Sequence, residues 1–178
     1  WEFIGFRGLS SHGATVGIII SIILYKIRYK YDSVLWIFDR IVIAVALGGM
    51  FVRIGNFFNS EIVGKYTNSD FGIIFLNRSE ALPRHPAQLY EAFGYLLLFI
   101  LLVLIYNKTK LSQNRGFVFG LFLSILFGIR FIVEYVKESQ GGIEEALGIL
   151  STGQWLSIPF ILLGFALMTL GLKNKANG

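Results

Sequence analysis

The sequence predicts an all-α fold, a polytopic bundle of about five transmembrane helices with an extracytoplasmic loop region. Of the 178 residues, 54% are hydrophobic and only 15% are charged, whereas a soluble domain carries roughly 25% charged residues. Apolar runs recur along the chain and alternate with polar connections, which is the pattern of a multi-pass membrane protein. We therefore treat residues 1–178 as a single integral membrane domain.

The first two spans are predicted at 14–25 and 34–52. The first approaches the roughly 17-residue minimum for a span only when its flanking residues are added. Gly13 and Gly17 in it form a GxxxG step, which favours close helix packing. Asp39 and Arg40 open the second span, and a charge is tolerated there only near the membrane edge.

No run between positions 53 and 87 is long enough to cross a bilayer. Polar clusters at 67–70 and 77–80 mark this stretch as a loop, and loops of this length are usually functional or disordered. Three further spans are predicted at 92–106, 116–136 and 153–172, with an acidic connection at 137–151.

Basic residues set the predicted orientation. They lie in alternate connections, which the positive-inside rule assigns to the cytoplasm. The 53–87 loop and the acidic 137–151 connection then face outward. The chain begins on Trp1 without a signal-peptide pattern, so we expect the C-terminal part of a longer protein. The basic residues that set the orientation are Lys26, Arg28, Lys30, Lys108, Lys110, Arg115, Lys173 and Lys175.

Composition also narrows the chemistry. The chain has no cysteine, which excludes a thiol nucleophile, an iron–sulfur cluster and a disulfide within it. Its two histidines, His12 and His85, lack metal-ligand spacing, so we predict no metal site and no cofactor. The net charge of +5 comes from basic residues between apolar runs, so nucleic acid is not an expected partner.

Unusual polar residues are expected at one depth, near the outer surface. His12 opens the first span, Arg53 closes the second and His85 precedes the third. Arg130 lies about 22 Å past Arg115 at 1.5 Å per residue, in the outer half of a core roughly 30 Å thick. Two arginines can bind a phosphodiester through planar, bidentate hydrogen bonds, and a histidine can accept a proton. These residues favour transfer chemistry on a phospholipid, with a second substrate supplying the nucleophile.

Simpler interpretations stay open for each residue. Arg53 could snorkel to the interface, and His12 could be an interfacial histidine. Arg130 and Glu134, one turn apart, could neutralise each other, and 88–91 could simply begin a helix. Two other functions are a transporter that uses the Arg130/Glu134 pair for ion coupling, which would predict internal repeats, and a non-catalytic membrane subunit.

The stretch RIGNFFNSEIVG at positions 53–64 closely resembles the signature of the bacterial prolipoprotein diacylglyceryl transferases. The similarity extends, in family order, to SHG at 11–13, RHPAQLYE at 84–91, RFIVE at 130–134 and GQWLSIP at 153–159. The 53–64 block is specific by itself, and the ordered set runs from one end of the chain to the other.

The resemblance implies a bacterial inner-membrane enzyme. It would transfer a diacylglyceryl group from phosphatidylglycerol to the lipobox cysteine in the signal peptide of a prolipoprotein, with a thioether and glycerol phosphate as products. By position, His12, Arg53 and Arg130 match the family's catalytic histidine and phosphate-handling arginines, and Glu134 would orient Arg130. The implied substrate-binding residues are Asn56, Glu61, Gly64, His85, Tyr90 and Glu134.

The sequence departs from the family pattern at three positions. Val52 replaces a common glycine, Lys137 replaces a frequent arginine, and Leu126 stands where a tyrosine is expected. Leu126 argues against any mechanism that needs a phenol one turn before Arg130. The family also has further N-terminal membrane helices, which this chain lacks.

Overall fold

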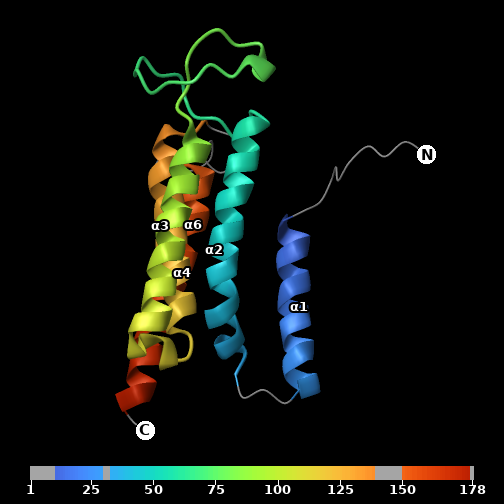
Figure 1. Cartoon of the computed structure of the whole chain (residues 1–178), viewed down its shortest axis with the longest axis vertical. Coiled ribbons are helices and arrows are strands. Elements are labelled where there is room, and N and C mark those ends of the chain that lie inside the picture. The colour runs from blue at the N-terminus through green and yellow to red at the C-terminus, as the bar shows by residue number, and fades with distance from the viewer. Residues whose placement is uncertain (1–10, 30–32, 139–149, 177–178) are drawn as a thin grey trace, which may run out of the picture.

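The protein forms a bundle of long helices capped at one end by a loop region (Figure 1). The computed structural model describes residues 11–29, 33–138 and 150–176, with side chains for 16–29, 33–138 and 150–173. The all-α prediction is confirmed. In chain order the elements are α1 (Ser11–Tyr29), α2 (Val34–Phe58), the 3-10 helix η1 (Leu76–Arg78), α3 (Ala87–Lys108), the 3-10 helix η2 (Lys110–Gln113), α4 (Phe117–Val133), the 3-10 helix η3 (Glu134–Val136) and α6 (Thr152–Ala176).

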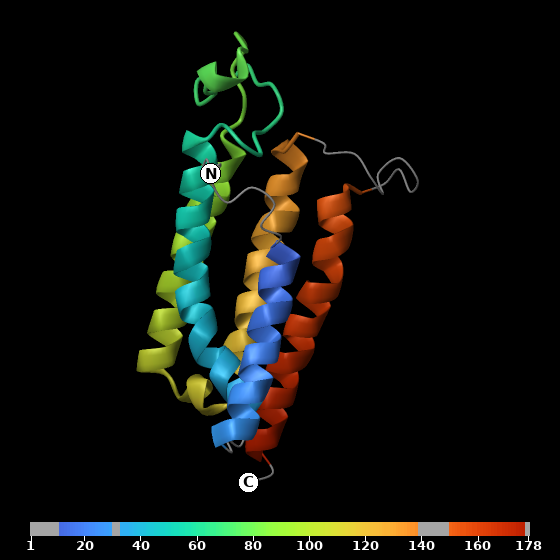
Figure 2. The same cartoon turned by 90° about the vertical axis from the view of Figure 1, so that its right-hand side faces the viewer.

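Within the described residues, four helices are long and apolar enough to cross a membrane: α2, α3, α4 extended by η3, and α6. They stand side by side, whereas α1, with its nineteen residues, runs along the outside of the bundle (Figures 1 and 2). The prediction of about five spans therefore corresponds to these four helices plus α1. Residues 59–86, which connect α2 to α3, rise above the bundle and are called the head below.

The bundle is held together by apolar side chains of α2, α3 and α4 and by close packing of α6 along α4. Gly120 of α4 and Gly164 of α6 touch, because a Cβ added at Gly120 would lie 2.6 Å from the Gly164 carbonyl oxygen. By contrast, a Cβ added at Gly17 would have no neighbour within 4 Å among the described residues. The close packing expected at the GxxxG step in α1 therefore does not occur at Gly17. The central cluster consists of Val42, Ala46, Leu98, Leu102, Val118, Phe122 and Leu123.

Asp39 joins α2 to the start of α4 at the end of the bundle away from the head. Its carboxylate accepts hydrogen bonds from the backbone N–H groups of Gly116 (2.7 Å) and Phe119 (2.8 Å). The first N–H groups of a helix lack partners within the helix and favour a negative charge. Asp39 is only 1% exposed, so the charge is tolerated because the helix end satisfies it. Its neighbour Arg40 instead lies over the Trp36 ring, 3.4 Å from the centroid.

The helices are longer at the head end than the apolar runs predict. The loop was expected to begin at Arg53, but α2 continues to Phe58 and α3 already begins at Ala87. Asn59 caps α2 by donating its backbone N–H to Gly55 O and Phe57 O. The polar residues at 53–56 thus lie on a continuous helix, where each has a fixed direction.

Arg84 organises the head. It is 3% exposed, donates to Glu80, to Glu138 Oε1 (3.0 Å) and to Gly64 O (3.0 Å), and lies 3.8 Å from the centroid of the Tyr66 ring. The guanidinium of Arg84 lowers the pKa of Glu80 below its usual range. Both groups therefore stay charged at neutral pH, and the head contains this ionic cluster beside its buried apolar residues Val63 and Phe75.

Backbone hydrogen bonds tie the head to the end of α4. Gly64 N–H donates to His85 O (2.9 Å), and Lys65 N–H donates to Val136 O (2.8 Å). Gly64 lies in close contact with both backbone segments, because an added Cβ would lie 2.5 Å from His85 O and 2.8 Å from Val136 O. Only glycine allows this approach.

Candidate functional site

A buried ion pair connects α2 and α3 directly below the head. Glu91 is fully buried, and its Oε2 lies 2.7 Å from Arg53 Nε. Its other oxygen, Oε1, lies 3.4 Å from Nζ of Lys137, which is itself 7% exposed. A carboxylate is buried in an apolar bundle only when opposite charges compensate it. Glu91 therefore fixes two cations from distant parts of the chain around one point.

Asn56 and Glu61 extend this ion pair toward the head. Arg53 Nη1 donates to Asn56 Oδ1 (3.3 Å), and Asn56 Nδ2 donates to Glu61 Oε2 (2.7 Å). The Gln88 amide, 1% exposed and one turn before Glu91, donates to the backbone oxygen of Glu61. Arg53, Asn56 and Glu61 thus form a hydrogen-bonded chain that sets the direction of the guanidinium.

Glu134 extends the same network to α6. Its Oε2 lies 3.4 Å from Lys137 Nζ. Its carboxylate also rests against Gly153 in the first turn of α6, because an added Cβ there would lie 2.5 Å from Glu134 Cδ. The N-terminus of a helix favours such a negative charge. Within the described part of the chain, Glu134 forms no ion pair with Arg130. The open alternative that Arg130 and Glu134 neutralise each other is therefore not what the structure shows, since Glu134, in η3 just past α4, lies beside Lys137 instead.

Arg130 approaches the network from α4. It lies over the Phe127 ring, 5.9 Å from the centroid. Tyr95 of α3, 3% exposed, interacts electrostatically with Arg53, Glu91 and Arg130. The two arginines, although they come from different helices, thus both lie close enough to Tyr95 to act on it electrostatically. We call the group of Arg53, Asn56, Glu61, Glu91, Arg130, Glu134 and Lys137 the charged site.

Two predicted residues form a separate pair. His85 Nδ1 lies 3.2 Å from the Tyr90 hydroxyl, and the two rings meet edge to face with centroids 6.2 Å apart. Tyr90 is 36% exposed and lies at the first turn of α3. The His85 backbone oxygen accepts the Gly64 N–H, and Gly64 in turn pairs with Lys137 of the charged site. His12 lies in the first turn of α1, but its side chain is outside the described residues.

An apolar cavity of about 480 Å³ lies among α1, α2, α4 and α6. Leu126 and Phe127, one turn before Arg130, line it, and Phe160 of α6 stacks on Phe127 with centroids 4.4 Å apart. The cavity therefore runs up to the residue beneath the Arg130 guanidinium. Leu126 lines this cavity, at the position where the family pattern has tyrosine.

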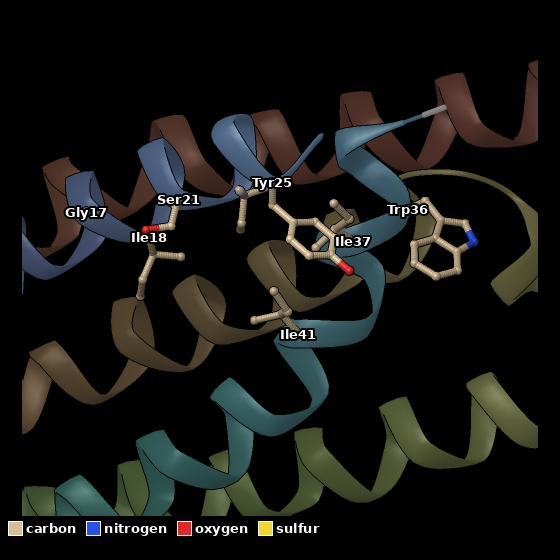
Figure 3. A pocket seen from close by; sticks show the side chains of 8 residues that line it. Gly17, Ile18, Ser21, Tyr25, Trp36, Ile37 and Ile41 are labelled. Atoms are coloured by element: carbon tan, nitrogen blue, oxygen red, sulfur yellow. The ribbon is translucent and has the colours of Figure 1, made fainter. Parts of the chain in front are cut away.

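A second apolar cavity, of about 710 Å³, lies between α1 and the first turns of α2. Ile18 and Tyr25 of α1 and Ile37 and Ile41 of α2 line it, and in Figure 3 the Tyr25 ring points toward Ile37. It is far from Arg53 along α2, so it is not part of the charged site.

Comparison with known proteins identifies the family. Residues 1–170 match the sequence model of the prolipoprotein diacylglyceryl transferases. The chain belongs to this family.

Curated relatives in the family carry the name phosphatidylglycerol–prolipoprotein diacylglyceryl transferase. The protein of Tolumonas auensis is 47% identical over 176 residues, covering 99% of this chain and 66% of that protein. The protein of Bacteroides fragilis is 43% identical over 178 residues, and that of Rickettsia typhi 43% identical over 159. The chain spans 62% and 60% of the length of these two relatives.

Sequence reasoning missed Glu91, Lys137 and Gln88 as parts of the site. From the sequence, Glu91 can simply belong to the start of a helix, and Lys137 stands out only as a departure from the family pattern. The available signal was the carboxylate itself: an ionisable residue inside a predominantly apolar span is a functional candidate by default. Its partners could not be named from the sequence, since Arg53 lies on another helix and Lys137 follows η3.

Proposed function

We propose that the full-length protein containing this chain transfers the diacylglyceryl group of phosphatidylglycerol to the lipobox cysteine thiol of prolipoproteins. The names of the family relatives support the reaction and its two substrates. The observation that carries the proposal is that Arg53 and Arg130 both act on Tyr95 and that an apolar cavity reaches Phe127, one turn before Arg130. This arrangement suits a ligand with a phosphate at one end and acyl chains at the other.

The phosphate of phosphatidylglycerol docks between Arg53 and Arg130. Guanidinium groups remain charged at neutral pH and bind phosphate oxygens in a planar, bidentate manner. Asn56 and Glu61 hold Arg53 in direction, so little rotamer entropy is lost on binding. An acyl chain enters the apolar cavity past Leu126 and Phe127.

The transfer forms one bond and breaks one bond. His12 assists removal of the proton from the lipobox thiol, whose free pKa is about 8.5. The thiolate sulfur attacks the glyceryl carbon, the carbon–oxygen bond to phosphate breaks, and glycerol phosphate departs with that oxygen and the bonding electrons. The phosphate charge rises from −1 to −2 in this step, which the two arginines stabilise. Both reacting atoms come from the substrates, so the proposed step needs no cofactor or metal.

The remaining residues have supporting roles in this proposal. Gly64, through its backbone contacts, holds the head on the end of α4 above the charged site. His85 and Tyr90 form an exposed pair at the start of α3, where an incoming peptide can meet it. Glu134 holds Lys137 and the start of α6, which replaces the orienting role toward Arg130 that the sequence predicted.

The proposed location is the bacterial cytoplasmic membrane, with the charged site toward the extracytoplasmic side. The ends of α1 and α3 that carry Lys26, Arg28 and Lys108 lie opposite the head (Figure 1). The positive-inside rule then orients the head outward. Prolipoprotein signal peptides and membrane lipids are the proposed partners.

The proposal is tested with full-length protein, phosphatidylglycerol labelled in its acyl chains, and a peptide containing a lipobox. We expect the wild type to label the peptide and Arg130→Ala to abolish the label. Arg40→Ala is the matched control, since Arg40 stacks on Trp36 far from the charged site and its loss should leave labelling intact. Undiminished labelling by Arg130→Ala would remove Arg130 from the mechanism, and an unlabelled peptide with wild type would favour the transporter or subunit alternatives.

A further inference from the structure

The charged site carries equal numbers of formal positive and negative charges. Its cations are Arg53, Arg130 and Lys137, and its carboxylates are Glu61, Glu91 and Glu134. Glu61 is exposed and Glu134 is 14% exposed at the side chain, so water screens both in part. Glu91, at 0%, is unscreened. Glu91 is therefore the carboxylate that most strongly lowers the positive potential felt by an anion at Arg53.

The contact between Glu91 and Arg53 is ionic without a directed hydrogen bond. Oε2 lies 2.7 Å from Arg53 Nε, yet it has no hydrogen-bond partner among the described residues, because the geometry is misaligned. The direction of the guanidinium comes from Asn56 on Nη1. Glu91 thus contributes charge to Arg53 more than orientation.

The proposed reaction creates a need for such a charge. Phosphatidylglycerol arrives with a phosphate charge of −1, whereas glycerol phosphate leaves with −2. Arginines that bind the substrate well bind the product more tightly, since electrostatic attraction grows with charge. A site with uncompensated arginines would retain its product and turn over slowly.

We propose that Glu91 is a positioning residue that moderates the affinity of Arg53 for phosphate and so speeds release of the dianionic product. This inference rests on the function proposed above. Lys137 makes this role of Glu91 possible. Its ammonium lies beside Glu91 Oε1 and remains there, in this proposal, when Arg53 binds phosphate. Without Lys137, Glu91 would then be left as a buried lone charge, which is costly.

The test compares Glu91→Gln with wild type in full-length enzyme, measuring kcat, KM for phosphatidylglycerol and Ki for glycerol phosphate. Glutamine keeps the shape and an acceptor oxygen but removes the charge. We expect Ki to fall roughly tenfold, KM to fall less, and kcat to fall because release slows. Glu91→Asp, which keeps the charge, should restore Ki toward the wild-type value.

Two further variants separate this role from a structural one. Asp39→Asn removes an equally buried carboxylate at the opposite end of the bundle, so it should lower stability without changing the ratio of KM to Ki. Lys137→Gln leaves Glu91 with Arg53 alone and removes a cation, so Ki should rise. If only one of Glu91→Gln and Lys137→Gln folds, the inference is still tested, since Ki is expected to fall in the first and to rise in the second.

The inference is overturned if Ki for glycerol phosphate rises or stays unchanged in Glu91→Gln, or if Ki falls in Lys137→Gln. Failure of the proposed function gives a different result, because wild-type enzyme would then leave the lipobox peptide unlabelled.

Discussion

Arg53 makes contacts that a lysine cannot reproduce. Its Nε faces Glu91 while its Nη1 donates to Asn56, so one side chain serves a carboxylate and an amide at once. The planar fork of arginine has donors fixed in these directions, whereas lysine carries a single point charge.

We expect Arg53→Lys to lower kcat/KM for diacylglyceryl transfer by roughly 10- to 100-fold, because bidentate phosphate binding is lost. Arg78→Lys in the head is the matched control. Arg78 is 34% exposed at the side chain, and exposed ion pairs contribute little. Equal activity of Arg53→Lys and wild type would argue that Arg53 does not bind the phosphate.

Gly64 gives a second prediction at this scale. Gly64→Ala places a Cβ against the backbone oxygens of His85 and Val136, which cannot move without shifting the head. We expect a loss of about 1–3 kcal/mol in stability, typical of overpacking, together with lower transfer activity. Gly48→Ala, with nothing within 4 Å, should be neutral or slightly stabilising. Thermal unfolding in detergent compares the two, and equal midpoints would contradict the packing argument.

At the scale of elements, α4 depends on a residue of another helix for its start. Gly116 and Phe119 donate their backbone N–H groups to the Asp39 carboxylate of α2. Asp39 thus takes the role that an N-cap side chain of the same helix usually has. The registers of α2 and α4 are therefore fixed against each other at the end far from the head.

Asp39→Ala should cost about 1–3 kcal/mol, the usual penalty for leaving buried donors unpaired. The thermal midpoint of the full-length protein in detergent measures it. Arg40→Gln changes the adjacent residue and loses its position over the Trp36 and Tyr106 rings and its exposed hydrogen bond to Trp36 O, but it leaves no buried donor unpaired, so its midpoint should lie closer to wild type. A fully stable Asp39→Ala protein would mean that water or another group caps α4.

The helices were largely predictable because apolar length is a strong signal, and their ends were not. The spans predicted at 34–52 and 92–106 became α2 and α3, each with polar turns added at the head end. Asn56 and Gln88 hold those turns through hydrogen bonds to a loop residue, Glu61. Such bonds depend on the folded loop, and a local apolar pattern does not contain them.

For the whole molecule, the sequence predicts some members of the charged site, but neither Glu91 and Lys137 nor the pairing. Depth along each span places Arg53 and Arg130 at one level. Which carboxylate meets which cation depends on helix rotation and on where α4 ends, and Glu134 accordingly turns to Lys137. Nor does the sequence predict that Arg84 joins Glu80, Glu138 and the Gly64 backbone in the head.

The ion pair between Glu80 and Arg84 predicts that the head is destabilised by acid. Since Arg84 lowers the pKa of Glu80, the folded head binds the proton of Glu80 less readily than the unfolded head. The stabilisation is present above the unfolded value of about 4.3 and is lost as the pH falls through the lower folded value. Limited proteolysis from pH 7 to pH 3 should therefore cut residues 59–86 faster in acid. Glu80→Gln should show faster cleavage already at pH 7 and a flatter pH dependence.

Topology can be tested on a clean background, because the chain has no cysteine. A cysteine at Phe71, exposed in the head, should react with an impermeant maleimide added to intact cells or spheroplasts. A cysteine at Lys110, in η2 at the opposite end, should react only after the membrane is opened. Labelling of the Lys110 cysteine from outside would reverse the proposed orientation.

The backbone pairing of Gly64 with the segment at Lys137 has a mechanical consequence. The head and the Lys137 ammonium are attached to the same short stretch of chain, so neither can be displaced alone. In the proposed function, a prolipoprotein peptide that binds the head would therefore also displace the ammonium that balances Glu91. Peptide binding and the charge at the proposed phosphate site would then be coupled through a few main-chain atoms.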